Sequence, residues 1–265
     1  MKKVGVIGVT YEATATFYRM LCGRSQELIG PGRNPDILLH TRDFREYLES
    51  AKGDFRGWTV LMLDSISRLA AAGCDFVVCP ANSNHVVYEE VSAAAELPWI
   101  NMIEAVFDAV RREPPGATPP VCGILGTNFT VESDIFGRYA SGIPLVYPEP
   151  ELQEALHAEI VNHLVFGTVR DAGLEIVRRC LASIRGAGAS DHGVIGLLLE
   201  GGRVVVEVTA GPAGTRRPIG ENAGVETNLS ARRALTASPG IRPSCDPTTA
   251  VRRRTAGPRR RGMRT

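Results

Sequence analysis

The sequence predicts an α/β protein with two pseudo-symmetric lobes, each a parallel sheet flanked by helices, and a ligand cleft between the lobes. Three observations support this fold class. Strand and helix patterns alternate through the first 185 residues, which is typical of parallel sheets covered by helices. A stretch with four prolines at 113–120 divides the alternation into two runs. The composition then changes, and the last 65 residues contain no Phe, Tyr or Trp.

The elements of the first lobe follow from the spacing of its apolar residues. Short apolar runs bounded by polar or turn-forming residues predict four strands, at 3–8, 36–40, 75–80 and 98–102. Apolar residues at helical spacing predict helices between them, at 14–22, 59–72, after Asn82, and at 103–111. The pattern then begins again after the prolines. It predicts strands at 121–125 and 145–147, and helices at 130–139, 152–164 and 171–184.

The predicted organisation therefore has four parts. They are a first lobe (1–112), a Pro-rich linker (113–120), a truncated or degraded second lobe (121–200) and an Arg/Gly/Pro-rich tail (201–265). The tail carries 13 Arg, no Lys and 4 acidic residues, a net charge of +9, whereas residues 1–200 carry −8. We expect the tail to be largely irregular and disordered, because it has too little apolar surface to offset the entropy lost on ordering.

Polar residues follow several of the predicted strands. Thr10, Thr41, the pair Asn82 and Ser83, and Thr127 each come just after a strand. In parallel sheets the ligand lies beyond the carboxyl ends of the strands, and loops opening onto helix N-termini favour an anion. The alternative is that Thr10, Ser83 and Thr127 only cap helices. Their recurrence at four strand ends favours binding of a carboxylate or phosphate.

Composition excludes several other classes of protein. A chain of 265 residues with 44% apolar content can bury a sizeable core. It has no apolar run long enough to cross a membrane and no signal-peptide pattern at its start, so we expect a cytoplasmic location. Its cysteines form no CxxC pair, and neither a metal site nor a disulfide framework is expected; they are Cys22, Cys74, Cys79, Cys122, Cys180 and Cys245.

Several segments resemble the aspartate/glutamate racemase family, and residues 37–44 resemble its broad-specificity amino-acid racemase branch most. The matching segments are GVIGVTYEAT at 5–14, ILLHTRDF at 37–44, GCDFVVCPANSNH at 73–85, PWINMIE at 98–104, GILGTNFTV at 123–131 and EIVNHLVFG at 159–167. In order and spacing the match covers residues 3–185. The resemblance implies two α/β lobes, no cofactor, a small amino-acid or carboxylate ligand in the cleft, and, by analogy, a homodimer.

The resemblance also implies a mechanism in which two facing cysteines invert an α-carbon. One thiolate removes the α-proton, and the other thiol delivers a proton to the opposite face. Residues that match the family's substrate-binding positions are Thr10, Thr41, Asn82, Ser83 and Thr127. Neither catalytic thiol is intact, because Ala81 stands at the first cysteine position and Leu198 at the second. Cys79 is expected to be a core residue, and His85 either a family histidine or a structural residue.

The tail admits two explanations. A reading-frame error near residues 186–200 of a GC-rich gene would give Arg, Gly, Ala, Pro and Thr, as observed. A genuine basic tail would instead contact nucleic-acid phosphates nonspecifically through its arginine runs at 252–254 and 259–261. Composition favours the reading-frame error. Sequencing the gene would decide, because the other frames must then encode a Gly-Cys-Thr-Glu segment.

The sequence therefore predicts a cofactor-independent amino-acid racemase of the aspartate/glutamate type, with impaired activity. Two alternatives remain. One is an inactive protein that binds a small carboxylate or amino acid, and the other is a cofactor-free lyase or decarboxylase on the same scaffold. A dinucleotide-binding fold is disfavoured, since Gly5 and Gly8 do not form the Gly-x-Gly-x-x-Gly pattern.

Overall fold

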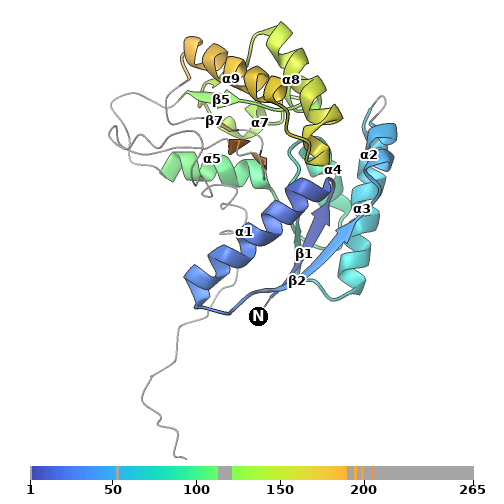
Figure 1. The fold of residues 1–265 in the computed structure, drawn as a ribbon. Helices are drawn as coiled ribbons and strands as arrows, with labels where there is room; N and C mark the ends of the chain where they lie inside the picture. Colours follow the sequence, from blue (N-terminus) through green and yellow to red (C-terminus); the bar gives the residue numbers. More distant parts are fainter. Residues whose placement is uncertain are drawn as a thin grey trace, which may run out of the picture.

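The computed structural model describes residues 2–51, 54–112 and 121–189, and beyond them the backbone of three two-residue strands. The predicted linker (113–120) lies outside the described residues, as does the predicted tail (201–265) apart from Val204–Val205. The described chain forms two parallel sheets with helices packed against them (Figure 1). The predicted α/β class and the two-lobe arrangement are confirmed.

The first sheet has four parallel strands in the order β2-β1-β3-β4. They are β1 (Lys3–Gly8), β2 (Asp36–Thr41), β3 (Phe76–Val78) and β4 (Trp99–Ile100). The helices of this part are α1 (Tyr11–Ile29), α2 (Phe44–Ser50), α3 (Arg56–Ala71), the 3-10 helix η1 (Ser83–Val87), α4 (Tyr88–Ala94) and α5 (Met102–Arg112). All four predicted strands are present. The seven-residue helix α2 was not predicted.

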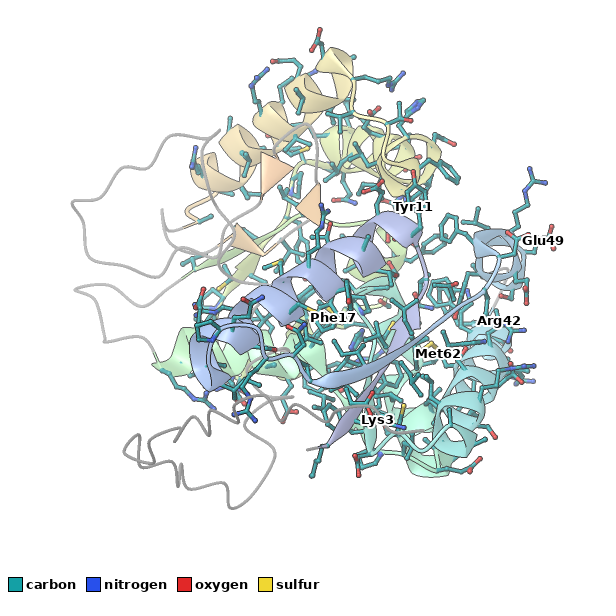
Figure 2. All side chains as sticks on the ribbon, turned by 60° about the horizontal axis from the view of Figure 1, so that its bottom comes forward. Lys3, Tyr11, Phe17, Arg42, Glu49 and Met62 are labelled. Carbon is teal, nitrogen blue, oxygen red and sulfur yellow. The ribbon has the colours of Figure 1, made fainter. Side chains whose placement is uncertain are left out.

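Helices cover both faces of the first sheet. On one face, Phe17 and Leu21 from α1 pack with Val4 and Val6 of β1. On the other, α3 contributes Met62 to a larger cluster built around Ile7 and Val77. Figure 2 labels Phe17 and Met62 on the two helices that flank the sheet. Successive side chains of β1 point to opposite faces of the sheet, so a strand covered by helices on both faces needs apolar residues on each face.

The second sheet has three parallel strands in the order β6-β5-β7. They are β5 (Cys122–Ile124), β6 (Leu145–Val146) and β7 (Val194–Ile195), and β8 (Leu198–Leu199) pairs antiparallel with β9 (Val204–Val205). The helices are α6 (Asn128–Glu132), α7 (Gly137–Ala140), α8 (Pro150–Asn162), η2 (Leu164–Phe166) and α9 (Asp171–Gly186). Beyond residue 186 the chain therefore still supplies a strand, β7, to this sheet.

The predicted single helix at 130–139 is wrong, because the segment divides into α6 and α7. Two local features interrupt it. The Ser133 hydroxyl donates hydrogen bonds to the carbonyl oxygens of Phe129 and Thr130, the preceding turn of the helix. Asp134 then adopts a left-handed conformation with φ of 48°. A residue in the left-handed conformation ends a regular α-helix, and Asp adopts this conformation more readily than most residues.

Helix α5 connects the two lobes. It follows β4 of the first sheet, yet Ile103 and Phe107 pack with Cys122 and Ile124 of β5. On the opposite face of the second sheet, α8 and α9 form a further cluster with Leu125. The last helix of the first half of the chain therefore belongs to the core of the second lobe, which fixes the two sheets relative to each other.

Candidate functional site

A cavity of about 170 Å³ lies where the strand ends of the two sheets meet. Its first-lobe wall includes Val9 and Thr10 after β1 and residues 78–84 at the end of β3. Its second-lobe wall includes Leu125, Gly126 and Thr127 after β5, with side chains from α6 and α8. The sequence predicted a cleft at this place, because the carboxyl ends of parallel strands are where such folds bind ligands.

Four of the five predicted binding residues line this cavity. They are Thr10, Asn82, Ser83 and Thr127, and Ala81 lines it with them. Thr41 is not among the lining residues. Its position explains why: a Cβ on Gly8 would lie only 2.6 Å from Thr41 Cγ2, so the Thr41 side chain packs over the end of β1. Roles in ligand binding stay predictions for all five residues.

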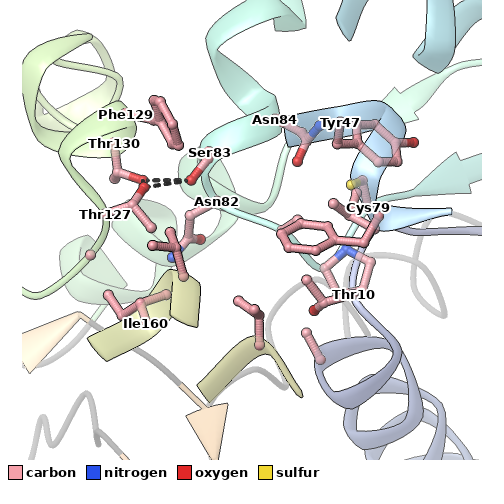
Figure 3. Close-up of a pocket in the computed structure, with 18 of the residues that line it drawn as sticks. Thr10, Tyr47, Cys79, Asn82, Ser83, Asn84, Thr127, Phe129, Thr130 and Ile160 are labelled. Carbon is pink, nitrogen blue, oxygen red and sulfur yellow. Dashed lines mark hydrogen bonds between the residues drawn. The ribbon is translucent and has the colours of Figure 1, made fainter. Parts of the chain in front are cut away.

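Three hydroxyl groups meet across the cavity (Figure 3). Ser83 Oγ lies 2.9 Å from Thr127 Oγ1 and 3.0 Å from Thr130 Oγ1, and the two threonine oxygens lie 3.3 Å apart. Ser83 comes from the first lobe, and Thr127 and Thr130 from the second. The sequence did not single out Thr130, although it lies three residues beyond Thr127, in the short helix α6 that Thr127 precedes.

The capping interpretation of Thr10 and Thr127 is not supported. Both residues precede helices in an extended conformation, but neither side chain makes a capping hydrogen bond to a backbone amide of the described chain. The loop that carries Thr127 is instead held from α8. Gln153 Nε2 donates to the Gly126 carbonyl oxygen and to Asn128 Oδ1, both at 3.0 Å. The Thr127 hydroxyl instead bonds those of Ser83 and Thr130 at the cavity, which Thr10 also lines.

One thiol, that of Cys79, borders the cavity. Its side chain is 1% exposed. Burial raises the pKa of this thiol to about 12, against a smaller opposing effect of a hydrogen bond with the Ala81 backbone. At neutral pH Cys79 is therefore protonated and cannot act as a thiolate base. Cys180 packs in the α8–α9 cluster, where its thiol donates to the Leu152 carbonyl oxygen, and it does not line the cavity.

His85 is a structural residue. It is 1% exposed, Nδ1 donates to the Ala81 carbonyl oxygen at 2.9 Å, and Nε2 accepts from the Met102 amide at 3.3 Å. The ring also packs against Tyr88 and Trp99. Burial lowers the pKa of His85 to about 4, so the ring is neutral at physiological pH. His85 thereby fixes the loop that carries Ala81 to the start of α5.

The sequence missed the apolar walls of the cavity. Aromatic side chains from both lobes line it, and they are Phe17, Phe44, Tyr47, Trp58 and Phe129. Trp58 Nε1 donates to the Tyr47 carbonyl oxygen at 2.7 Å, which joins α3 to α2. The Trp58 and Phe129 rings meet edge to face at 5.7 Å, so the first lobe contacts the second here. Phe44 lies three residues after Thr41, the last residue of β2, and this position near a strand end was the available signal.

Further contacts hold the lobes together outside the cavity. The Tyr11 hydroxyl donates to the Phe166 carbonyl oxygen at 2.7 Å, and the Phe44 and Phe166 rings lie 6.0 Å apart. The Tyr139 hydroxyl donates to Glu89 Oε1 at 2.6 Å.

Among the described residues, no cluster of three or more His, Cys, Asp or Glu is arranged to hold a metal ion. No helix in the described ranges is both long and apolar enough to cross a membrane.

Comparison with known proteins identifies the family. The sequence model of the Asp/Glu/hydantoin racemase family matches residues 4–194. The chain belongs to this racemase family. A broad-specificity amino-acid racemase of Bacillus subtilis, RacX, is 31% identical over 143 residues. This match covers 52% of the present chain but only 60% of the length of RacX.

Solved structures related to the racemase family share the fold. A Yersinia pestis protein described provisionally as an Asp/Glu racemase superposes with a TM-score of 0.63 at 27% identity, over 74% of this chain and 85% of that one. An aspartate racemase homologue from Pyrococcus horikoshii gives a TM-score of 0.58 at 26% identity, over 74% and 84% of the two chains. The resemblance deduced from the sequence motifs is confirmed.

The two residues that the sequence resemblance places at the racemase cysteine positions, Ala81 and Leu198, differ in what the structure describes. Ala81, at the first position, lines the cavity between Pro80 and Asn82. Leu198, which the resemblance places at the second cysteine position, lies in β8. The structure describes only the backbone of β8, so the Leu198 side chain lies outside the described structure. Ala81 presents a methyl group to the cavity, and its match to the family's first cysteine stays a prediction.

Proposed function

We propose that this racemase-family protein binds a small carboxylic acid, amino acids included, in the cavity between its lobes, and that its racemase activity is impaired. One observation carries the proposal. Neutral hydrogen-bonding side chains from both lobes converge on the cavity at the strand ends, together with Ala81, which the resemblance places at the position of the first family thiol. The described part of the site therefore has groups that suit a carboxylate, and Ala81 itself cannot move a proton.

The carboxylate-binding part rests on the hydroxyl cluster. The Ser83, Thr127 and Thr130 hydroxyls hydrogen-bond to one another, and each can turn to donate to an anionic oxygen. Asn82 adds an amide donor on the same side of the cavity. Thr10 lies at the N-terminus of the 19-residue helix α1, where the helix dipole favours negative charge.

The impairment follows from proton chemistry. Removing the α-proton of a carboxylate requires a base held against the α-carbon, and a positioned base contributes roughly 10²- to 10⁴-fold to such rates. Ala81 has no titratable group, and the Cys79 thiol keeps its proton at neutral pH. We therefore expect binding without rapid inversion. The homodimer, the cytoplasmic location and the independence from a cofactor stay predictions.

Incubation with amino acids in deuterated water separates the candidate functions. We expect ligand-induced stabilisation of the protein with little α-deuterium incorporation and no release of CO₂. Rapid α-exchange with inversion would show that the racemase reaction is intact. Release of CO₂ from a substituted malonate would instead identify a decarboxylase. Absence of stabilisation by every carboxylate tested would contradict the binding function itself.

A further inference from the structure

The described lining of the cavity carries no formally charged side chain. Among the described residues that line it there is no Lys, Arg or His, and no Asp or Glu. Its polar side chains are all neutral. They are the hydroxyl or amide residues Thr10, Asn82, Ser83, Asn84, Thr127 and Thr130, together with Tyr47, Trp58 and Cys79. Much of the remaining wall is aromatic or aliphatic.

The apolar wall is built by both lobes and is well ordered by packing. Phe44, Tyr47 and Trp58 come from the first lobe, and Phe129 and Val161 from the second. Trp58 is 3% exposed, and its indole hydrogen bond to the Tyr47 carbonyl oxygen leaves the ring no freedom to leave the wall. Its edge-to-face contact with Phe129 closes the wall across the two lobes.

This lining discriminates by charge. Aspartate and glutamate would bring a second carboxylate. An ionised carboxylate loses its hydration on burial, and it gains no cation from the described lining residues. An aryl or branched alkyl group loses no comparable hydration and gains contact with the aromatic rings. The cavity, at about 170 Å³, is also large enough, since an apolar cavity of about 150 Å³ holds benzene.

We infer that the ligand is a monocarboxylic acid with an aryl or branched alkyl substituent, bound through its carboxylate by the Ser83–Thr127–Thr130 hydroxyls and through its substituent by the aromatic wall. This inference rests on the proposed carboxylate-binding function and narrows it. It departs from the aspartate/glutamate type of substrate expected from the sequence. The substituent, and not a second charged group, provides the selectivity.

The first experiment measures dissociation constants of the full chain by calorimetry, with phenylacetate, 3-methylbutanoate, succinate, aspartate, glutamate and benzyl alcohol as probes. Phenylacetate and 3-methylbutanoate are expected to bind at least ~10-fold more tightly than succinate, aspartate or glutamate. Benzyl alcohol, which has the ring without the carboxylate, is expected to bind at least ~10-fold more weakly than phenylacetate.

The outcomes separate the inference from the function on which it rests. Succinate, aspartate or glutamate binding as tightly as phenylacetate would overturn the inference and leave the carboxylate site standing. Equal binding of benzyl alcohol and phenylacetate would overturn the carboxylate site. If none of the probes binds to folded protein, both are overturned.

A charge placed in the wall provides a second test. Val161→Arg puts a cation beside the cavity, and we expect the ratio of succinate to phenylacetate affinity to rise at least ~10-fold. The matched control is Val60→Arg on α3, where the side chain is 65% exposed and does not line the cavity; the ratio should not change. An unchanged ratio in folded Val161→Arg protein would contradict the proposed wall.

Discussion

Ser83 and Thr127 place their hydroxyl oxygens 2.9 Å apart, although the two residues belong to different lobes and are 44 positions apart in the sequence. With Thr130 they form the one place in the cavity where hydroxyl groups of both lobes are hydrogen-bonded to each other within the described residues. A carboxylate bound there would contact both lobes at once.

Removing either hydroxyl should weaken ligand binding. Ser83→Ala and Thr127→Val each delete one donor, and a lost hydrogen bond of about 1 kcal/mol corresponds to a roughly fivefold higher dissociation constant for phenylacetate. Ser92→Ala, at an exposed position on α4, is the matched control and should leave the constant unchanged. Calorimetry measures all three variants. Wild-type affinity in both cavity variants would show that the carboxylate is bound elsewhere.

Restoring a thiol at the first family position should restore proton transfer. Ala81→Cys places a base on the cavity wall, and α-deuterium incorporation into phenylalanine or aspartate in deuterated water should rise by at least ~10² over wild type. NMR follows the loss of the α-proton signal. Ala81→Ser, which has a hydroxyl of similar size and no accessible anion, should remain at the wild-type rate. If the cysteine variant also stays at that rate, Ala81 is not where the base acts.

Cys79 should be unreactive in the folded protein. Alkylation requires the thiolate, and burial raises the pKa of Cys79 to about 12 while leaving its side chain 1% exposed. Cys22, on α1, is more exposed and serves as the internal reference. With iodoacetamide at neutral pH, mass spectrometry should show Cys22 modified at least ~10-fold faster than Cys79. Equal rates would mean that the cavity opens Cys79 to solvent.

Acid should destabilise the fold through His85. Its pKa is lowered from 6.5 to about 4 by burial, so the unfolded chain takes up a proton first as the pH falls. The stabilisation due to the neutral ring is therefore complete above pH 6.5 and is lost as the pH falls through 4. The total corresponds to roughly 3 kcal/mol of unfolding free energy.

Urea unfolding at several pH values tests this. His85→Gln should be less stable than wild type near neutral pH, because the contacts of the ring are lost, but its unfolding free energy should depend less on pH over this interval. His163→Gln, a half-buried residue outside the cavity, should keep the wild-type dependence. If the unfolding free energy of His85→Gln falls with pH as much as that of wild type, groups other than His85 cause the acid sensitivity.

Much of the fold could be predicted because its signals are local. Neighbouring residues alone show the apolar run of β1 and the polar residues at the strand ends. Together these two features predicted the position of the cavity. Helix α2 was missed because seven residues show little periodicity, although Asp43 caps it by accepting a hydrogen bond from the Arg45 amide at 3.0 Å. β7 is two residues long and gives no clear strand pattern.

The chemistry of the cavity depended on contacts that no local pattern encodes. Trp58 and Phe129 each stand one residue before a predicted helix, at 59–72 and 130–139, and no local pattern marks them. Only the meeting of their rings at 5.7 Å across the lobes shows that they form one wall. Thr41 was placed at the site by its strand end, but its methyl packs against Gly8. Thr130 becomes a candidate binding residue only because Ser83 approaches it from the other lobe.

The neutral lining of the cavity also bears on how ligands are recruited. None of the described residues that line the cavity is charged, so apart from the dipole of α1 the wall offers an anion little long-range attraction. Dissolved salt screens attractions between separated charges and has little effect on contacts between neutral donors and a bound anion. Occupancy of this site would then follow the ligand's concentration and remain nearly indifferent to ionic strength.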